Sequence, residues 1–132
     1  MIFTKIVPRV SETDGVGHIN NVFVPIWFEA GRREIFRIFS PKLDFINWKL
    51  ALVKVTVEYV DQLYLAEDVE VRTGVEKIGN SSFTIKEEIR QTNRICAKGQ
   101  AIYVNYNFKD KKSEPIANEV RHKLKIIKFV ED

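Results

Sequence analysis

The chain has 132 residues, of which 45% are hydrophobic and 30% charged, a composition typical of one soluble globular domain. A domain of this size can fold without a metal or disulfide, and the single cysteine, Cys96, cannot form a disulfide within the chain. The net charge of +3 suits a small anionic ligand, but the basic residues form no stripe that would follow a nucleic-acid backbone. No apolar run approaches membrane-spanning length and no signal peptide is visible, so we expect a cytoplasmic protein with no membrane or nucleic-acid partner.

The first third of the chain is predicted to form a strand, a loop and a long helix. Apolar and β-branched residues mark a strand over residues 2–10, and the loop 11–20 follows. Residues 22–39 form a helical pattern whose first half is apolar around its whole circumference, which predicts burial on all sides. Pro25 is tolerated only in a first turn, which places the helix start near Asn21. Glu29 is expected to pair with Arg33 or Arg32.

The remaining chain is predicted to form four strands and a short helix. Apolar and polar residues alternate over residues 53–59, 69–76, 83–89 and 95–108. We expect these strands to pair consecutively in an antiparallel sheet. Ala97, Gly99 and Ala101 share one face of the last strand, so a bulky element is expected to cross there closely. Pro115 begins the terminal helix, which runs to about Leu124.

These elements predict a single α+β domain over residues 1–132, in which the sheet covers the long helix. One curved sheet cannot cover a helix that is apolar on all sides at its start. A second copy of the chain is therefore expected to complete the burial, in a homodimer or homotetramer.

The loop before the helix concentrates the residues that carry chemistry. It reads Asp14-Gly15-Val16-Gly17-His18-Ile19-Asn20-Asn21, and so brings a carboxylate, an imidazole and two carboxamides to the helix N-terminus. Unpaired N–H groups at a helix N-terminus stabilise a developing oxyanion. Because Asp-Gly is also a common turn pair and Asn a common helix cap, a purely structural loop is the alternative.

This loop, followed by Trp27-Phe28-Glu29-Ala30 and Arg32-Arg33, resembles the hotdog-fold acyl-CoA thioesterases of the 4-hydroxybenzoyl-CoA thioesterase family. Its Asp-x-x-Gly-His-x-Asn-Asn part is also similar to a motif of the acyl-carrier-protein thioesterases. Weaker matches extend over nearly the whole chain, at Glu58-Tyr59, at residues 78–82 and at Pro115-Ile116. The resemblance implies a five-stranded antiparallel sheet wrapped around one long central helix, with a short C-terminal helix. It also implies dimers that share one continuous sheet and have active sites at their interface.

By motif position, the resemblance makes Asp14 the catalytic carboxylate and the Asn21 backbone N–H the donor that polarises the carbonyl. Asp14 then either attacks the thioester or deprotonates a water molecule, and the sequence leaves both routes open. The Val22 N–H is expected as a second oxyanion donor. His18 is either an acid–base or orienting partner, or a loop histidine bonded to backbone. Val24 stands where the family usually has tyrosine, which leaves the substrate class open.

Further candidates for substrate binding each have a structural alternative. Asn20 either contacts the substrate or caps the helix. Glu58 and Tyr59 end the second strand, where they reach a partner's site or face solvent, as do Asp61 and Gln62. Ser81 and Ser82 contact the pantetheine arm or simply form a polar hairpin. The basic residues late in the chain pair with coenzyme A phosphates or form a solvated face; they are Lys109, Lys111, Lys112, Arg121 and Lys123. Glu12 lies just before the loop, and its replacement by glutamine is expected to leave turnover nearly unchanged.

The predicted activity is hydrolysis of an acyl-CoA to the free acid and coenzyme A, with no metal or other cofactor. One alternative is an acyl-carrier-protein thioesterase, and another is a hotdog dehydratase that uses His18 and Asp14. A third is a non-catalytic acyl-CoA-binding protein on the same fold. The presence of Asp14 favours an enzyme, and the loop does not resemble dehydratase motifs.

Overall fold

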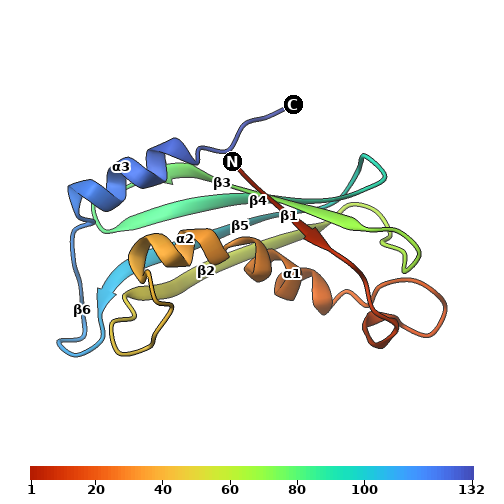
Figure 1. Ribbon diagram of the computed structural model, residues 1–132, viewed down its shortest axis with the longest axis horizontal. Coiled ribbons are helices and arrows are strands. Elements are labelled where there is room, and N and C mark those ends of the chain that lie inside the picture. Colours follow the sequence, from red (N-terminus) through yellow and green to blue (C-terminus); the bar gives the residue numbers. More distant parts are fainter.

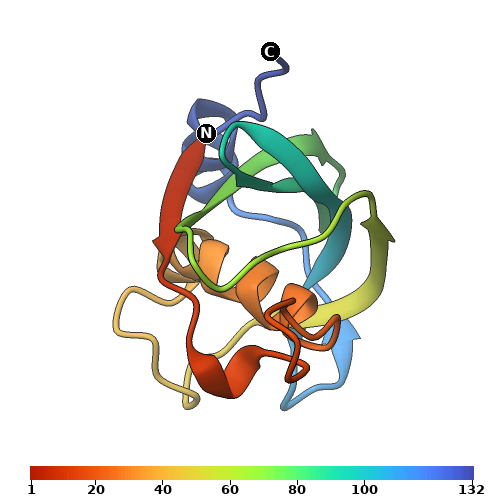
Figure 2. The same cartoon turned by 90° about the vertical axis from the view of Figure 1, so that its right-hand side faces the viewer.

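A strongly curved antiparallel sheet wraps around two consecutive helices in the computed structural model, which describes residues 1–132 (Figures 1 and 2). The strands are β1 (Ile2–Ile6), β2 (Leu50–Tyr59), β3 (Val69–Ile78), β4 (Ser82–Gln91), β5 (Arg94–Asn107) and the short β6 (Lys112–Ser113). The helices are the 3-10 turn η1 (Val10–Glu12), α1 (Phe23–Gly31), α2 (Arg33–Phe39) and α3 (Asn118–Ile126). The predicted α+β hotdog fold is thereby confirmed.

The strand order is β1-β3-β4-β5-β2, with β6 paired to the end of β5. Strands β3, β4 and β5 pair consecutively, as predicted. The expected pairing of β2 with β3 is wrong, because β2 pairs with β5 and residues 60–68 then carry the chain to β3 at the far side of the sheet. The ten-residue β2 is therefore left at one edge of the sheet and the five-residue β1 at the other.

The predicted single helix over residues 22–39 is interrupted at Arg32. There the backbone N–H donates to the Glu29 carbonyl three residues earlier, and α2 begins one residue later. The Arg32 guanidinium is buried and forms two hydrogen bonds to the Glu87 carboxylate of β4, at 2.9 and 2.6 Å, and one to the Tyr103 hydroxyl at 3.1 Å. The expected ion pair of Glu29 with Arg32 or Arg33 is wrong, since Glu29 forms none and Arg32 binds Glu87.

Close packing of α1 on the sheet depends on a missing side chain in β5. A Cβ atom at Gly99 would lie 2.9 Å from the Phe28 ring, and the neighbouring Ala97 and Ala101 are fully buried. The predicted close crossing is thereby confirmed. Burial of the helix start on all sides is not reached within one chain, because Val22 and Ile26 remain 61% and 55% exposed.

The C-terminal part pairs with β3 beyond the point where β1 begins. Helix α3 packs against α2 and β3, and the following chain exchanges backbone hydrogen bonds with Val75 of β3. The predicted terminal helix is confirmed, although it begins at Asn118 rather than at Pro115. No helix has both the length and the apolar character needed to cross a membrane.

Candidate active site

Two glycines shape the loop that carries Asp14. Gly15 and Gly17 have φ angles of +91° and +90°, in the left-handed region that favours glycine. The chain reversal lets the Asp14 N–H donate to the His18 carbonyl at 2.9 Å, and His18 Nδ1 lies 4.0 Å from Asp14 Oδ2. Asp14 Oδ1 accepts the Val16 N–H at 3.0 Å, while the side chain stays 38% exposed. The carboxylate is therefore fixed in position yet open to solvent.

The same loop is fastened to the connection between β2 and β3. The Ile19 N–H donates to the Leu63 carbonyl at 2.8 Å. The His18 ring meets the Tyr64 ring edge-on, with centroids 5.2 Å apart. The His18 side chain makes no hydrogen bond within the chain, so the alternative of a ring bonded to backbone is not found.

Three residues at the helix start have different roles in the structure. Asn20 forms the turn that leads into α1, since its Oδ1 accepts the Val22 N–H at 3.1 Å and its carbonyl accepts the Phe23 N–H at 3.0 Å. The N-cap position of α1 is Val22, which has no side-chain cap, so the cap expected at Asn20 is not formed. Since Asn20 Oδ1 occupies the Val22 N–H, the expectation that this N–H serves as a second oxyanion donor is wrong. The Asn21 N–H donates to no group of the protein, and it remains free to polarise a carbonyl.

A cavity of about 260 Å³ opens beside this helix start. The loop and α1 contribute Ile19, Asn21 and Val24 to it, and the residues from Tyr59 to Leu63 form the opposite wall. The Tyr59 hydroxyl donates to the Asn21 carbonyl at 3.1 Å, which joins the end of β2 to the helix start. Figure 2 looks onto this end of the molecule, where the loop, the start of α1 and the end of β2 meet.

Two other side chains at this cavity are engaged within the protein. Asp61 forms an ion pair with Arg94 at 2.7 Å, which lowers the pKa of its carboxyl. Cys96 is buried, and burial raises the pKa of its thiol. A thiol that is buried and protonated is a poor nucleophile, so Cys96 has a structural role at this cavity.

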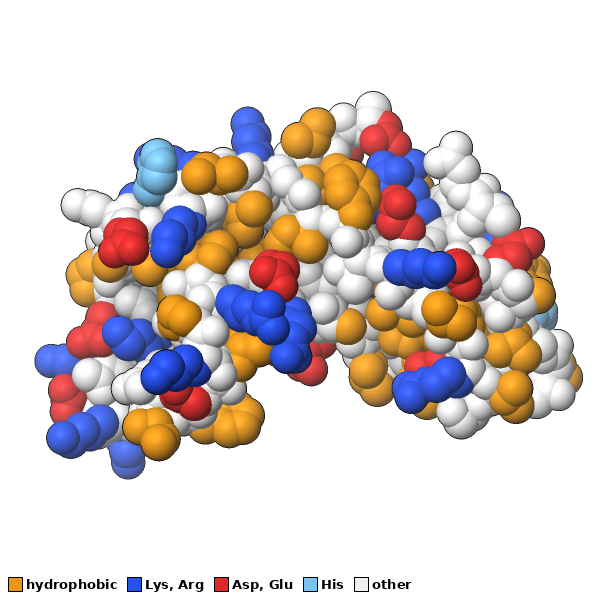
Figure 3. All heavy atoms as spheres, in the orientation of Figure 1, with side chains coloured by type: hydrophobic (Ala, Val, Ile, Leu, Met, Phe, Trp, Pro, Cys, Tyr) orange, Lys and Arg blue, Asp and Glu red, His pale blue; other side chains and the backbone are white.

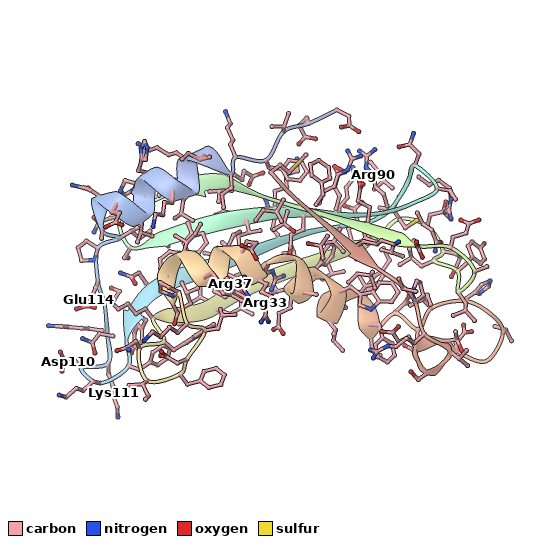
Figure 4. All side chains as sticks on the ribbon, viewed as in Figure 1. Arg33, Arg37, Arg90, Asp110, Lys111 and Glu114 are labelled. Carbon is pink, nitrogen blue, oxygen red and sulfur yellow. The ribbon has the colours of Figure 1, made fainter.

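Several predicted binding residues lie at the opposite end of the same chain. The Ser81 carbonyl accepts the Asn105 N–H beside the beginning of β2, and Ser82 follows at the start of β4. The charged β5–β6 hairpin lies at this end too, as the labelled Asp110, Lys111 and Glu114 show in Figure 4. The length of β2, about 30 Å at 3.3 Å per residue, separates this end of the chain from the end that holds Asp14.

Glu58 lies near the other end of β2, where it is exposed and forms no ion pair.

Glu12 is a residue that the sequence does not mark as important. It is only 3% exposed, and its carboxylate accepts hydrogen bonds from the Trp27 indole at 3.0 Å and the Arg9 backbone at 2.7 Å. Its own carbonyl accepts the Asn20 N–H at 2.9 Å. Glu12 therefore links the loop to α1 and has a structural role, while the expectation that Glu12→Gln leaves turnover nearly unchanged stays a prediction. A lone acidic residue in a polar stretch is typical of a surface position, and its spacing gives no other signal.

Glu12→Gln is expected to lower stability in a pH-dependent way. Burial opposes the charged form, but hydrogen bonds from Arg9 and Trp27 outweigh it and hold the pKa of Glu12 below its ordinary value of 4.5. The charge therefore adds stability above the unfolded-state pKa, and this contribution is lost as pH falls through the folded-state pKa. We expect a loss of about 1–2 kcal/mol at neutral pH, measured by urea unfolding. An equally large loss near pH 3 would contradict this explanation.

The curled sheet, its central helix and the loop at the helix start define the class of hotdog proteins. The model of the thioesterase-like superfamily matches residues 8–124. The chain therefore belongs to the thioesterase-like superfamily, which confirms the resemblance to hotdog-fold thioesterases and the predicted class of thioester hydrolases.

Known proteins of similar structure and sequence agree with this placement. The structure of a predicted thioesterase from Bacillus stearothermophilus is 52% identical, with a TM-score of 0.95 over 99% of this chain and 98% of that chain. A thioesterase from Thermus thermophilus, complexed with coenzyme A and Zn, is 20% identical and shares the fold, with a TM-score of 0.83 over 96% and 92% of the two chains. The uncharacterized protein YsmA of Bacillus subtilis is 29% identical over 83 residues, which span 63% of this chain and 56% of that protein.

Proposed function

We propose that the protein hydrolyses an acyl-CoA thioester to the free acid and coenzyme A. The observation that carries this proposal is the exposed Asp14 carboxylate in a loop that leads to the free Asn21 N–H. Membership of the thioesterase-like superfamily supports the reaction type, and the coenzyme A in the Thermus thermophilus structure supports the leaving group.

In the proposed reaction, Asp14 acts at the thioester carbonyl carbon. It either attacks that carbon, giving an anhydride that water then cleaves, or removes a proton from the attacking water molecule. The Asn21 N–H donates to the carbonyl oxygen as negative charge develops there, and one such donor typically stabilises the transition state by about 3 kcal/mol. In both routes the carbon–sulfur bond of the resulting intermediate breaks and coenzyme A leaves as the thiolate. In the nucleophilic route this step gives the anhydride, which water cleaves afterwards.

A thiol-release assay tests the proposal directly. Wild-type protein is given acyl-CoAs that differ in chain length and aromaticity, and the same acyl groups on acyl carrier protein. We expect release of free coenzyme A with at least one acyl group. Release from the carrier protein alone would favour the acyl-carrier-protein alternative. Tight acyl-CoA binding without any release would instead favour the non-catalytic binding protein.

We further propose that the protein forms a homodimer through β2, and that any tetramer pairs two such dimers. As an edge strand, β2 presents unpaired backbone groups, and its Leu52, Val53 and Val55 side chains are exposed. In an antiparallel pair of two β2 strands centred on Thr56, Lys54 of each strand faces Glu58 of the other. Opposite charges then lie across the interface from each other at both positions. Sedimentation should give a dimer at micromolar concentration, and a stable monomer would contradict the proposal.

Basic residues near the β5–β6 hairpin are proposed to assist coenzyme A binding. Lys49 and Lys109 line a cavity of about 450 Å³ at that end of the sheet. Because salt shortens the screening length from about 10 Å at 0.1 M to about 3 Å at 1 M, free coenzyme A should bind more weakly as salt rises. Calorimetric titration measures this, with Lys125→Ala on α3 as the control for Lys109→Ala. A salt dependence that Lys109→Ala leaves unchanged would remove Lys109 from the site.

We also predict that no metal or other cofactor takes part in the reaction, and that the protein is located in the cytoplasm. No group of three His, Cys, Asp or Glu side chains is arranged to hold a metal ion.

A further inference from the structure

The segment between α2 and β2, residues 43–48, exposes apolar side chains that the fold of one chain does not use. Phe45 is 86% exposed and its neighbour Ile46 is 93% exposed. In Figure 3, hydrophobic side chains lie at the surface of the lower left part of the molecule, where Figure 1 places this segment. Two adjacent large apolar side chains that are almost fully exposed make this segment a candidate interaction site.

The segment also has a fixed shape. The Phe45 ring packs against the Trp48 ring with centroids 5.6 Å apart, and the Trp48 indole donates to the Leu50 carbonyl at 3.0 Å. Asp44 Oδ1 accepts the Asn47 N–H at 3.0 Å. Leu43 has a φ of 51°, a left-handed conformation that leucine rarely adopts. A strained backbone that holds apolar side chains in solvent favours a functional role for the segment.

The segment cannot serve the active site of its own chain. It precedes Leu50 at the beginning of β2, whereas the cavity beside Asn21 lies beyond Tyr59 at the other end of that strand. In an antiparallel pair of β2 strands, however, the beginning of one strand lies beside the end of the other. With that pair centred on Thr56, residues 49–52 of one strand lie opposite Val60 to Leu63 of the other, which line the cavity. Residues 43–48 directly precede that stretch, so they come to the edge of the partner's cavity.

We propose that Phe45 and Ile46 of each subunit cover the active site of the partner subunit and receive a bulky apolar acyl group. This inference rests on the proposed thioesterase function and on the proposed β2 dimer. Because both side chains are uncharged and apolar, the substrate class that fits is an aromatic or medium-chain aliphatic acyl-CoA. A two-carbon acyl group is too short to bury such a surface.

The first test compares substrates in the variant Phe45→Ala/Ile46→Ala. We expect kcat/KM for benzoyl-CoA or octanoyl-CoA, whichever the wild type cleaves better, to fall about 10- to 100-fold, the usual effect of losing the burial of large apolar groups. The value for acetyl-CoA should change little. Ile126→Ala, which shortens an apolar side chain of α3 that is 70% exposed, is the matched control. An equal loss for all acyl-CoAs would overturn the acyl assignment.

The second test asks whether the two parts of the site come from different subunits. Asp14→Asn protein is mixed with Phe45→Ala/Ile46→Ala protein, and the subunits are exchanged by mild denaturation and refolding. A mixed dimer contains one site with both changes and one with neither. With random mixing, half of the dimers are mixed and each has one intact site, so about one quarter of wild-type activity toward the bulky acyl-CoA should be restored. Asp14→Asn alone should be inactive, and Phe45→Ala/Ile46→Ala alone should be impaired.

The outcomes separate the inference from the proposed function. If Asp14→Asn alone retains activity, the proposed mechanism fails. If Asp14→Asn is inactive and mixing restores nothing beyond the average of the two parents, the mechanism stands and the shared site is refuted. Sedimentation of each variant verifies the dimer, and Ile46→Ala alone replaces the double variant if that one dissociates.

Discussion

Asp14→Asn should reduce kcat on the best acyl-CoA by about 10²–10⁴-fold, the usual contribution of a positioned acid–base group. The fold should be kept, because an asparagine side chain can still accept the Val16 N–H that Asp14 Oδ1 accepts at 3.0 Å. KM should change far less than kcat, since the carboxylate acts on the transition state rather than on the bound substrate. Steady-state kinetics by thiol release measures both values.

Asp68→Asn is the control for this substitution. Asp68 is another exposed carboxylate, which forms an ion pair with Lys5, and its replacement should leave kcat unchanged. Wild-type turnover by Asp14→Asn would contradict the catalytic assignment, and a loss shared by Asp68→Asn would point to a general effect of charge.

Arg32→Met should cause the largest loss of stability among single substitutions in the central helices. Arg32 and Glu87 are 3% and 1% exposed, and the substitution leaves the Glu87 carboxylate buried without its partner. Removing one member of a buried pair usually costs about 3–5 kcal/mol, a large share of the stability of a small domain. Urea unfolding at neutral pH measures the change in the free energy of unfolding.

Two controls show whether the unpaired carboxylate causes this loss. Arg33→Met changes an exposed neighbour that binds no carboxylate, and it should have almost no effect (Figure 4). The double variant Arg32→Met/Glu87→Leu removes both charges and should regain much of the stability, because apolar residues often replace a buried pair well. A double variant no more stable than Arg32→Met alone would contradict this explanation.

Periodic patterns predicted most of the fold. The alternation over residues 69–76 and 83–89 corresponds to strands β3 and β4, and the small residues around Gly99 indicated where α1 crosses the sheet. The position of β2 could not be predicted in this way, because alternation describes the two faces of a strand and not its neighbours. At the helix break, Arg32 binds Glu87, 55 residues later, and no local pattern contains such a contact.

The candidate site was predictable where neighbours in the sequence form it. Asp14, His18 and Asn21 belong to one loop, so their proximity follows from the chain itself. The structural role of Glu12 was missed because it depends on Trp27, which lies 15 residues later in the chain. The occupied N–H of Val22 depends on the rotamer of Asn20, which the sequence does not contain.

The hydrogen bond between the Trp27 indole and Glu12 has a spectroscopic consequence. The chain has two tryptophans, and the indole N–H of each donates to one defined acceptor, Glu12 for Trp27 and the Leu50 carbonyl for Trp48. The Trp27 indole proton is shielded from water as long as η1 and the following loop stay docked on α1, so its exchange rate reports the opening of that loop. Two NMR signals thus follow the docking of the loop on α1 and the beginning of β2 separately, without any added label.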